Sequence, residues 1–243
     1  TSEKKEALPP KLFDLTALQK EANRIFGYTA KQTLDLAQSL YEKKLLTYPR
    51  TDSNYLTDDM KETAEAVIHT LLSKFSFMQG VKLIPEVTGL LNSKKVSDHH
   101  AVIPTMELEK MELSMLPESE RNILFLAGAR LLMACGTSHI YETATAVFSC
   151  EDYTFTAKGK TVLSSGWKEI ERFFLMNLKE KQEKENEKEL PAFCDGESFD
   201  SFPIKVTEHD TLPPKAYTKK VRFYLLWSAP ETRKPQRMRS VKA

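Results

Sequence analysis

The sequence has few cysteines, and no apolar run in it is long enough to cross a bilayer. Three cysteines in 243 residues, Cys135, Cys150 and Cys194, are odd in number and far apart. This argues against a disulfide framework or a zinc site and favours a reducing compartment. The longest apolar run, 123–135, is interrupted by Arg130 and is too short to be a membrane span. With no internal repeat and no secretory signal, these absences predict a cytoplasmic protein that does not contact a membrane.

The composition that remains is that of an ordinary globular protein. It is 41% hydrophobic and 28% charged, enough for one large domain or two small ones with a core. The net charge of +1 hides an asymmetry. Residues 1–218 carry 27 Lys and Arg against 33 Asp and Glu, a net charge of −6, whereas residues 219–243 carry 8 against 1, a net charge of +7. The opening Thr-Ser-Glu-Lys-Lys, without a Met, indicates the interior of a longer protein.

Two helices are predicted over residues 15–44. A capping box of Thr16 and Gln19 begins the first, Gly27 ends it, and a second capping box starts at Thr29. The pair resembles a helix-turn-helix element, and a plain αα-hairpin fits the same pattern.

Residue patterns and helix-end signals predict the other elements. The second helix carries an apolar stripe, which places its members in the core: Leu34, Ala37, Leu40 and Tyr41. Further helices are expected at about 58–75 and 117–135, a β-hairpin or meander at 141–149 and 152–158, a solvated Lys/Glu run at 178–189 and a last strand at 198–206. The fold class is therefore α+β.

The segment 47–53 contains groups suited to attack on a phosphate. The Tyr48 hydroxyl can act as a covalent nucleophile. An ordinary phenol has a pKa of about 10, so such a nucleophile needs a cation or a base beside it. Arg50 supplies a permanent cation that can clamp a phosphate, and Pro49 stiffens the backbone that presents both groups. A packed tyrosine beside a surface charge fits the same residues.

The neighbouring polar residues fit the same chemistry. Thr51 and Ser53 offer hydroxyls to phosphate oxygens, and Asp52 can orient an imidazole. Further along, His99 and His100 follow Asp98. Adjacent histidines of an extended chain point to opposite faces, which disfavours a metal site and favours one histidine that faces a phosphate.

In these motifs the chain resembles the type IA DNA topoisomerases, most closely the bacterial topoisomerase III branch. The motifs occur in family order from about residue 9 to residue 218: Leu15-Thr16-Ala17-Leu18-Gln19, Ala37-Gln38-Ser39-Leu40-Tyr41-Glu42, Leu46-Thr47-Tyr48-Pro49-Arg50-Thr51-Asp52-Ser53, Asp98-His99-His100-Ala101-Val102-Ile103-Pro104-Thr105, Gly166-Trp167 and Pro213-Pro214-Lys215-Ala216-Tyr217-Thr218.

The resemblance implies a role for four residues. Tyr48 matches the nucleophile that forms a 5′-phosphotyrosyl link, Arg50 the arginine on the scissile phosphate, and His99 the histidine near it. Asp52 matches the acid that pairs with that histidine. His100, with Thr51 and Ser53, is expected to contact DNA. The implied partner is single-stranded or underwound DNA, and the implied activity is strand passage through a transient break without ATP.

The resemblance also implies what the chain lacks. The family's magnesium is held by a Toprim domain, whose D-x-D-x-E run is absent here, so no metal site is expected in this chain and the isolated fragment is expected to be inactive. The predicted domains are a helical tyrosine domain at 12–137, a β-rich arch segment at 138–190, the start of a DNA-gripping base at 191–218 and an atypical tail at 219–243.

The tail departs from the family, which continues with an acidic helix. Codons for residues 221–228 can be chosen so that a shifted frame gives the family's residues, and we favour this frameshift hypothesis over an evolved DNA-binding arm.

Two other functions are alternatives to a topoisomerase. A non-enzymatic DNA-binding or interaction fragment fits the missing Toprim domain, while a tyrosine recombinase is disfavoured because neither adjacent histidine begins a His-x-x-Arg box.

Overall fold

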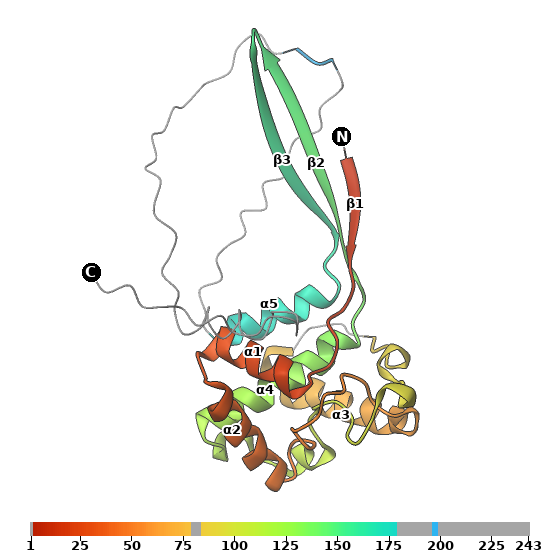
Figure 1. The fold of residues 1–243 in the computed structure, drawn as a ribbon, viewed down its shortest axis with the longest axis vertical. Coiled ribbons are helices and arrows are strands. Elements are labelled where there is room, and N and C mark those ends of the chain that lie inside the picture. Colours follow the sequence, from red (N-terminus) through yellow and green to blue (C-terminus); the bar gives the residue numbers. More distant parts are fainter. Residues whose placement is uncertain (1, 79–83, 179–195, 199–243) are drawn as a thin grey trace, which may run out of the picture.

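The computed structural model describes residues 2–78, 84–178 and 196–198. Within them a bundle of helices forms one body, and a long β-hairpin projects from it with a third strand alongside (Figure 1). This arrangement confirms the α+β fold class. Most of the predicted features after residue 178, including the strand at 198–206 and the basic tail, lie outside the described residues.

The elements follow one another in the order helices, hairpin, helix, after a first strand. The helices are α1 (Leu15–Phe26), α2 (Ala30–Glu42), α3 (Lys61–Lys74), α4 (Glu118–Ala134) and α5 (Trp167–Asn177). The strands are β1 (Ser2–Ala7), β2 (His139–Cys150) and β3 (Tyr153–Ser164). Short 3-10 turns occupy Asp58–Met60, Ser76–Met78, Thr88–Leu90, Ser93–Lys95, Met106–Lys110 and Leu113–Met115. Among the described helices, none is long and apolar enough to cross a bilayer.

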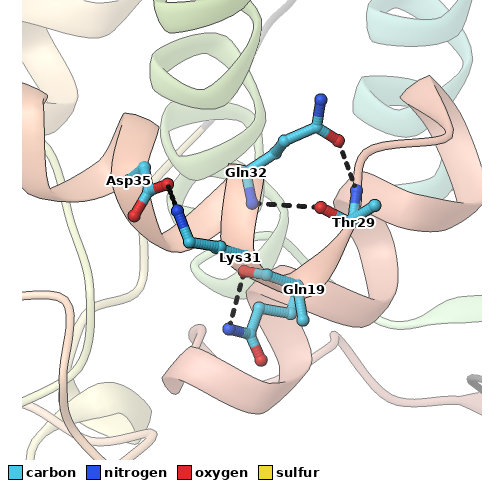
Figure 2. Close-up of polar contacts among 6 residues, drawn as sticks. Gln19, Thr29, Lys31, Gln32 and Asp35 are labelled. Carbon is cyan, nitrogen blue, oxygen red and sulfur yellow. Dashed lines mark hydrogen bonds and ion pairs between the residues drawn. The ribbon is translucent and has the colours of Figure 1, made fainter.

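The turn between α1 and α2 confirms one predicted capping box and corrects the other. Thr29 and Gln32 cap α2 reciprocally, side chain to backbone (Figure 2). Helix α1, however, is capped by Asp14, whose carboxylate accepts a hydrogen bond from the Ala17 N–H. Both Asp14 and Thr16 can cap a helix, which explains the error of two residues.

Gln19 has a different role from the predicted cap. Its buried side chain donates to the carbonyl of Ala30 over 3.0 Å, which ties α1 to the first residue of α2 (Figure 2). Gly27 ends α1 with a φ of 71°, as predicted, a conformation that glycine adopts without a Cβ penalty. The two helices thus form a tightly tied hairpin.

Helix α4 forms the centre of the helical body. Eleven of its residues are buried, on every side of the helix. Gly128 lies under the ring of Phe75, where a Cβ would come within 2.6 Å of that ring. Phe75 in turn contacts Phe125 and Phe77 at ring distances of 4.7 Å and 5.1 Å. The ring of Phe174 on α5 continues this cluster at 5.8 Å from Phe77, so α5, which the sequence analysis did not predict, belongs to the same core.

The hairpin is longer than predicted and begins at a tightly packed base. Strands β2 and β3 pair antiparallel from Ile140↔Ser164 to Cys150↔Tyr153, and β1 pairs with β2. At the base, Gly166 has a φ of 52°, and a Cβ there would lie 2.3 Å from the carbonyl oxygen of Ser138. The indole N–H of Trp167 donates to the carbonyl of Ala7, which fixes β1 to the start of α5.

Replacing Gly128 by Ala should destabilise the helical body. The added methyl would clash with the buried Phe75 ring, and overpacking of this kind costs about 1–3 kcal/mol. Denaturant unfolding would measure the loss in free energy of unfolding. Gly89→Ala is the matched control, because no atom lies within 4 Å of its Cβ position. Equal stability of the two variants would contradict this packing.

The thiol of Cys135 should be inert in the folded chain. Burial raises the pKa of Cys135 to about 12, and the thiolate is the reactive form. In a chain with Cys150→Ser and Cys194→Ser, a thiol reagent at neutral pH should modify Cys135 only after denaturation. With Cys150 restored, which is exposed, one site should react in the native chain. Rapid native labelling of Cys135 would show that this part of the core opens.

Candidate active site

Three segments that are far apart in the sequence cross at the candidate site. The segment before α1 supplies Phe13, whose carbonyl accepts from the Val102 N–H at 2.8 Å. The Leu15 N–H then donates to the carbonyl of Thr51 at 3.0 Å. Leu46 forms an antiparallel bridge with Pro104. The backbone around residue 48 is therefore held from both sides by main-chain hydrogen bonds.

Thr47 strengthens this crossing with its side chain. Its hydroxyl donates to the carbonyl of Ala101 at 3.1 Å and accepts from the N–H of Ile103 at 3.0 Å. Its own N–H donates to the Ile103 carbonyl. The residue directly before Tyr48 is thus fixed to the segment that follows the two histidines.

Tyr48 lies half-buried between two other rings. The ring centroid of His99 is 4.4 Å away, with the planes tilted by 48°. The ring of Tyr41, on α2, meets Tyr48 edge-on at 5.3 Å. The structure corrects the prediction that Tyr41 belongs to the core, because 40% of it is exposed. Tyr41 is the last residue of the apolar stripe predicted on α2, and it lies at the surface beside Tyr48.

Thr51 and Ser53 hold the loop from within. Thr51, 8% exposed, donates from its hydroxyl to the carbonyl of His99 at 2.7 Å. Ser53, 4% exposed, donates to the carbonyl of Lys95 at 2.9 Å and accepts from the Tyr55 N–H. This burial argues against the prediction that the two hydroxyls contact DNA phosphates. Their recorded partners instead give them a structural role.

Arg50 and Asp52, in contrast, are exposed. Within the described part of the chain Arg50 makes no ion pair, which leaves its guanidinium open to an anion. Asp52 accepts a hydrogen bond from the Ser97 hydroxyl at 3.2 Å. Among the described residues no hydrogen bond joins it to His99, so the expected pairing of these two stays a prediction.

The ring of His100 is tied to the backbone of the next residue. Its Nδ1 donates to the carbonyl of Ala101 at 2.8 Å, which requires a proton on that nitrogen. Its charge is also among the causes that lower the pKa of Asp59, after hydrogen bonds from Thr57 and from the backbone of Asp59. Its predicted contact with DNA stays a prediction.

The arrangement therefore combines the half-buried phenol of Tyr48 with the exposed imidazole of His99 and, two residues along, the exposed guanidinium of Arg50. A metal ligand set is a different matter: over 2–78, 84–178 and 196–198, no three or more His, Cys, Asp or Glu side chains gather into a group that could hold a metal ion.

Comparison with known proteins decides the family. A family model described as DNA topoisomerase matches residues 1–221. DNA topoisomerase 3 of Bacillus subtilis is 36% identical over 220 residues, which cover 88% of this chain and 30% of that protein. The chain belongs to the type IA DNA topoisomerases. DNA topoisomerase 3 of Bacillus cereus ATCC 14579 is 39% identical over 171 residues, 68% of this chain and 23% of that protein.

A solved structure agrees on the fold. Full-length topoisomerase I from Thermotoga maritima matches with a TM-score of 0.52 and 23% identity, over 71% of this chain and 28% of that one. The chain thus spans less than a third of the length of each of these relatives. The family resemblance found in the sequence motifs is confirmed.

Replacing the buried Thr51 by Val should destabilise the loop 47–53 while leaving the exposed side chains of that loop in place. The substitution keeps the shape but leaves the His99 carbonyl and the Ser53 N–H without their partner. An unsatisfied buried polar group costs about 1–3 kcal/mol, so the free energy of unfolding should fall by that amount. Thr154→Val, at an exposed strand position, is the control and should have little effect. If the two variants unfold alike, Thr51 does not hold the loop.

Proposed function

We propose that this chain is the segment of a type IA topoisomerase that cuts one DNA strand with Tyr48. The phenolic oxygen attacks the scissile phosphorus, the bond from phosphorus to the 3′ oxygen breaks, and a 5′-phosphotyrosyl link forms. The phenol loses its proton and the leaving 3′ oxygen gains one. Religation reverses these steps, which is why the cycle needs no ATP. The observation that carries the proposal is the half-buried Tyr48 beside His99, with the unpaired Arg50 two residues along.

Each neighbour contributes a different physical effect. Arg50 can hold two phosphate oxygens at once and offset the charge that develops on them. His99 can share or orient charge at the same phosphate. Asp52, whose carboxylate accepts a hydrogen bond from the Ser97 hydroxyl, supplies a carboxylate within the loop 47–53. Together they supply positioning and charge compensation.

We propose that magnesium, which the family uses, is held outside these residues. The carboxylates and imidazoles of the described segments do not gather as a ligand set. We therefore assign no step of this chain's chemistry to the metal. Since the match covers 30% of the Bacillus subtilis relative, we also propose that these 243 residues by themselves do not relax supercoiled DNA.

The proposed substrate is single-stranded or underwound duplex DNA in the cytoplasm. Paired bases of a relaxed duplex keep both backbones on a regular helix, whereas an unpaired strand can bend toward a recessed nucleophile. A second candidate function is a non-catalytic DNA-binding or interaction segment. It is favoured by the small share of the relatives' length that the chain spans.

Tyr48→Phe should abolish covalent capture of DNA. The change removes the attacking oxygen and keeps the ring between Tyr41 and His99, so non-covalent binding should persist. The test uses a chimera in which this chain replaces the matched 220-residue segment of Bacillus subtilis DNA topoisomerase 3. Labelled DNA that remains on the protein in denaturant reports the adduct.

Two further variants sharpen this test. Tyr41→Phe, the matched control, should still form the adduct because its hydroxyl is not the proposed nucleophile. Arg50→Ala should reduce cleavage by about 10²–10³-fold, the loss seen when one charge-stabilising donor is removed. A persistent adduct in the Tyr48→Phe chimera would refute the assignment. A folded chimera that captures no DNA with Tyr48 intact would favour the non-catalytic function.

A further inference from the structure

A second cluster of polar groups lies on the same three segments that cross at the candidate active site. Tyr55 lies between two lysines: the Lys95 ammonium donates to its hydroxyl at 3.2 Å and lies 4.7 Å from the ring centroid. The Lys11 ammonium lies 5.4 Å from the same centroid. The hydrogen bond from Lys95, and then the charges of Lys11 and Lys95, lower the pKa of the Tyr55 phenol.

Among the residues that the structure describes, no acid neutralises the two lysines. Throughout the described residues neither Lys11 nor Lys95 forms an ion pair with a carboxylate, and no carboxylate is among the influences on the Tyr55 pKa. Two ammonium groups that share one ring repel each other, so an anion between them would relieve an existing cost. This charge arrangement favours an anionic ligand.

Hydrogen bonds fix the backbone under all three residues. The carbonyl of Lys95 accepts from Ser53 and that of Tyr55 from the Ala101 N–H. On the other side, the Arg130 guanidinium lies 4.1 Å from the centroid of the buried Phe13 ring, and its Nη1 donates to the carbonyl of Lys11 at 3.4 Å. A site held in this way loses little entropy on binding.

The cluster is also close to the nucleophile along the chain. Tyr55 lies seven positions after Tyr48, and an extended chain spans at most ~3.6 Å per residue, so their Cα atoms lie within about 25 Å. The hydrogen bonds from Thr51 to the His99 carbonyl and from Ser53 to the Lys95 carbonyl join the segments of both clusters. One DNA strand can therefore reach both.

We infer that Lys11, Tyr55 and Lys95 form a phosphate-binding site that holds the DNA strand beside the scissile phosphate. The inference rests on the proposed function. The two ammonium groups and the phenolic O–H bind one phosphodiester a few nucleotides from the bond that Tyr48 attacks. They are positioning residues, because they fix the strand and do not touch the reacting atoms.

The test measures non-covalent binding of a labelled oligothymidylate to the full 243-residue chain carrying Tyr48→Phe, over a range of salt concentrations. Each phosphate contact on a single strand contributes about 0.7 to the slope of log affinity against log salt. Lys11→Gln and Lys95→Gln should each lower that slope by about this amount. Lys94→Gln is the matched control: it removes the same charge from the adjacent residue of the same 3-10 turn and should leave the slope unchanged.

A further variant distinguishes a built site from loose surface charge. Tyr55→Leu keeps both lysines but removes the ring and hydroxyl that hold them, and it should weaken binding several-fold at fixed salt. Equal effects of Lys94→Gln and Lys95→Gln, or wild-type binding by Tyr55→Leu, would overturn the inference. Since Tyr48→Phe is present throughout, these results do not depend on whether Tyr48 forms the covalent adduct.

Discussion

The hydrogen bond from the Thr51 hydroxyl to the His99 carbonyl joins two segments that lie 48 positions apart in the sequence. The Thr51 side chain is only 8% exposed, so its hydroxyl must find a protein partner. The same constraint acts at Ser53 and the Lys95 carbonyl. Because these hydroxyls face inward, the loop residues between and before them, Arg50 and Asp52, face outward. The exposed chemistry of the loop thus depends on polar groups that never reach the surface.

This constraint works only on a rigid foundation, which the helical body supplies. Helix α4 is buried on every side, and Gly128 allows Phe75 to pack directly against its backbone. Rings from α5 and from the turn after α3 complete that cluster. The loop 47–53, which carries Tyr48, is held against this body by the segment before α1, through Phe13 and Leu15. The position of Tyr48 therefore depends on these main-chain hydrogen bonds, which in turn depend on the aromatic packing of the helical body.

The sequence predicted those elements whose conformation is set by neighbouring residues and missed those set by distant contacts. Helices α1 to α4 and the hairpin follow from signals within each segment, which for α4 are the residues that begin and end it rather than a periodic stripe, and the tyrosine motif is contiguous. Strand β1 was missed because Ser2–Ala7 is mostly charged and becomes a strand only by pairing with β2. Helix α5 was missed although Ile170 and Phe174 are spaced as a helical stripe. The inward direction of Thr51 and Ser53 was not readable, because the carbonyls that they satisfy belong to residues 95 and 99.

The two lysines beside Tyr55 show how far such non-local order extends into function. Lys11 and Lys95 are 84 residues apart in the sequence, and nothing in either local motif pairs them. They meet because Arg130 fixes the backbone of one and Ser53 fixes that of the other. The segment 47–53 and this cluster therefore share Ser53 as a common support. In the function that we propose, a strand bound at one is held in a fixed relation to the other, and geometry of that kind would let a weak nucleophile such as a phenol act on a single phosphate.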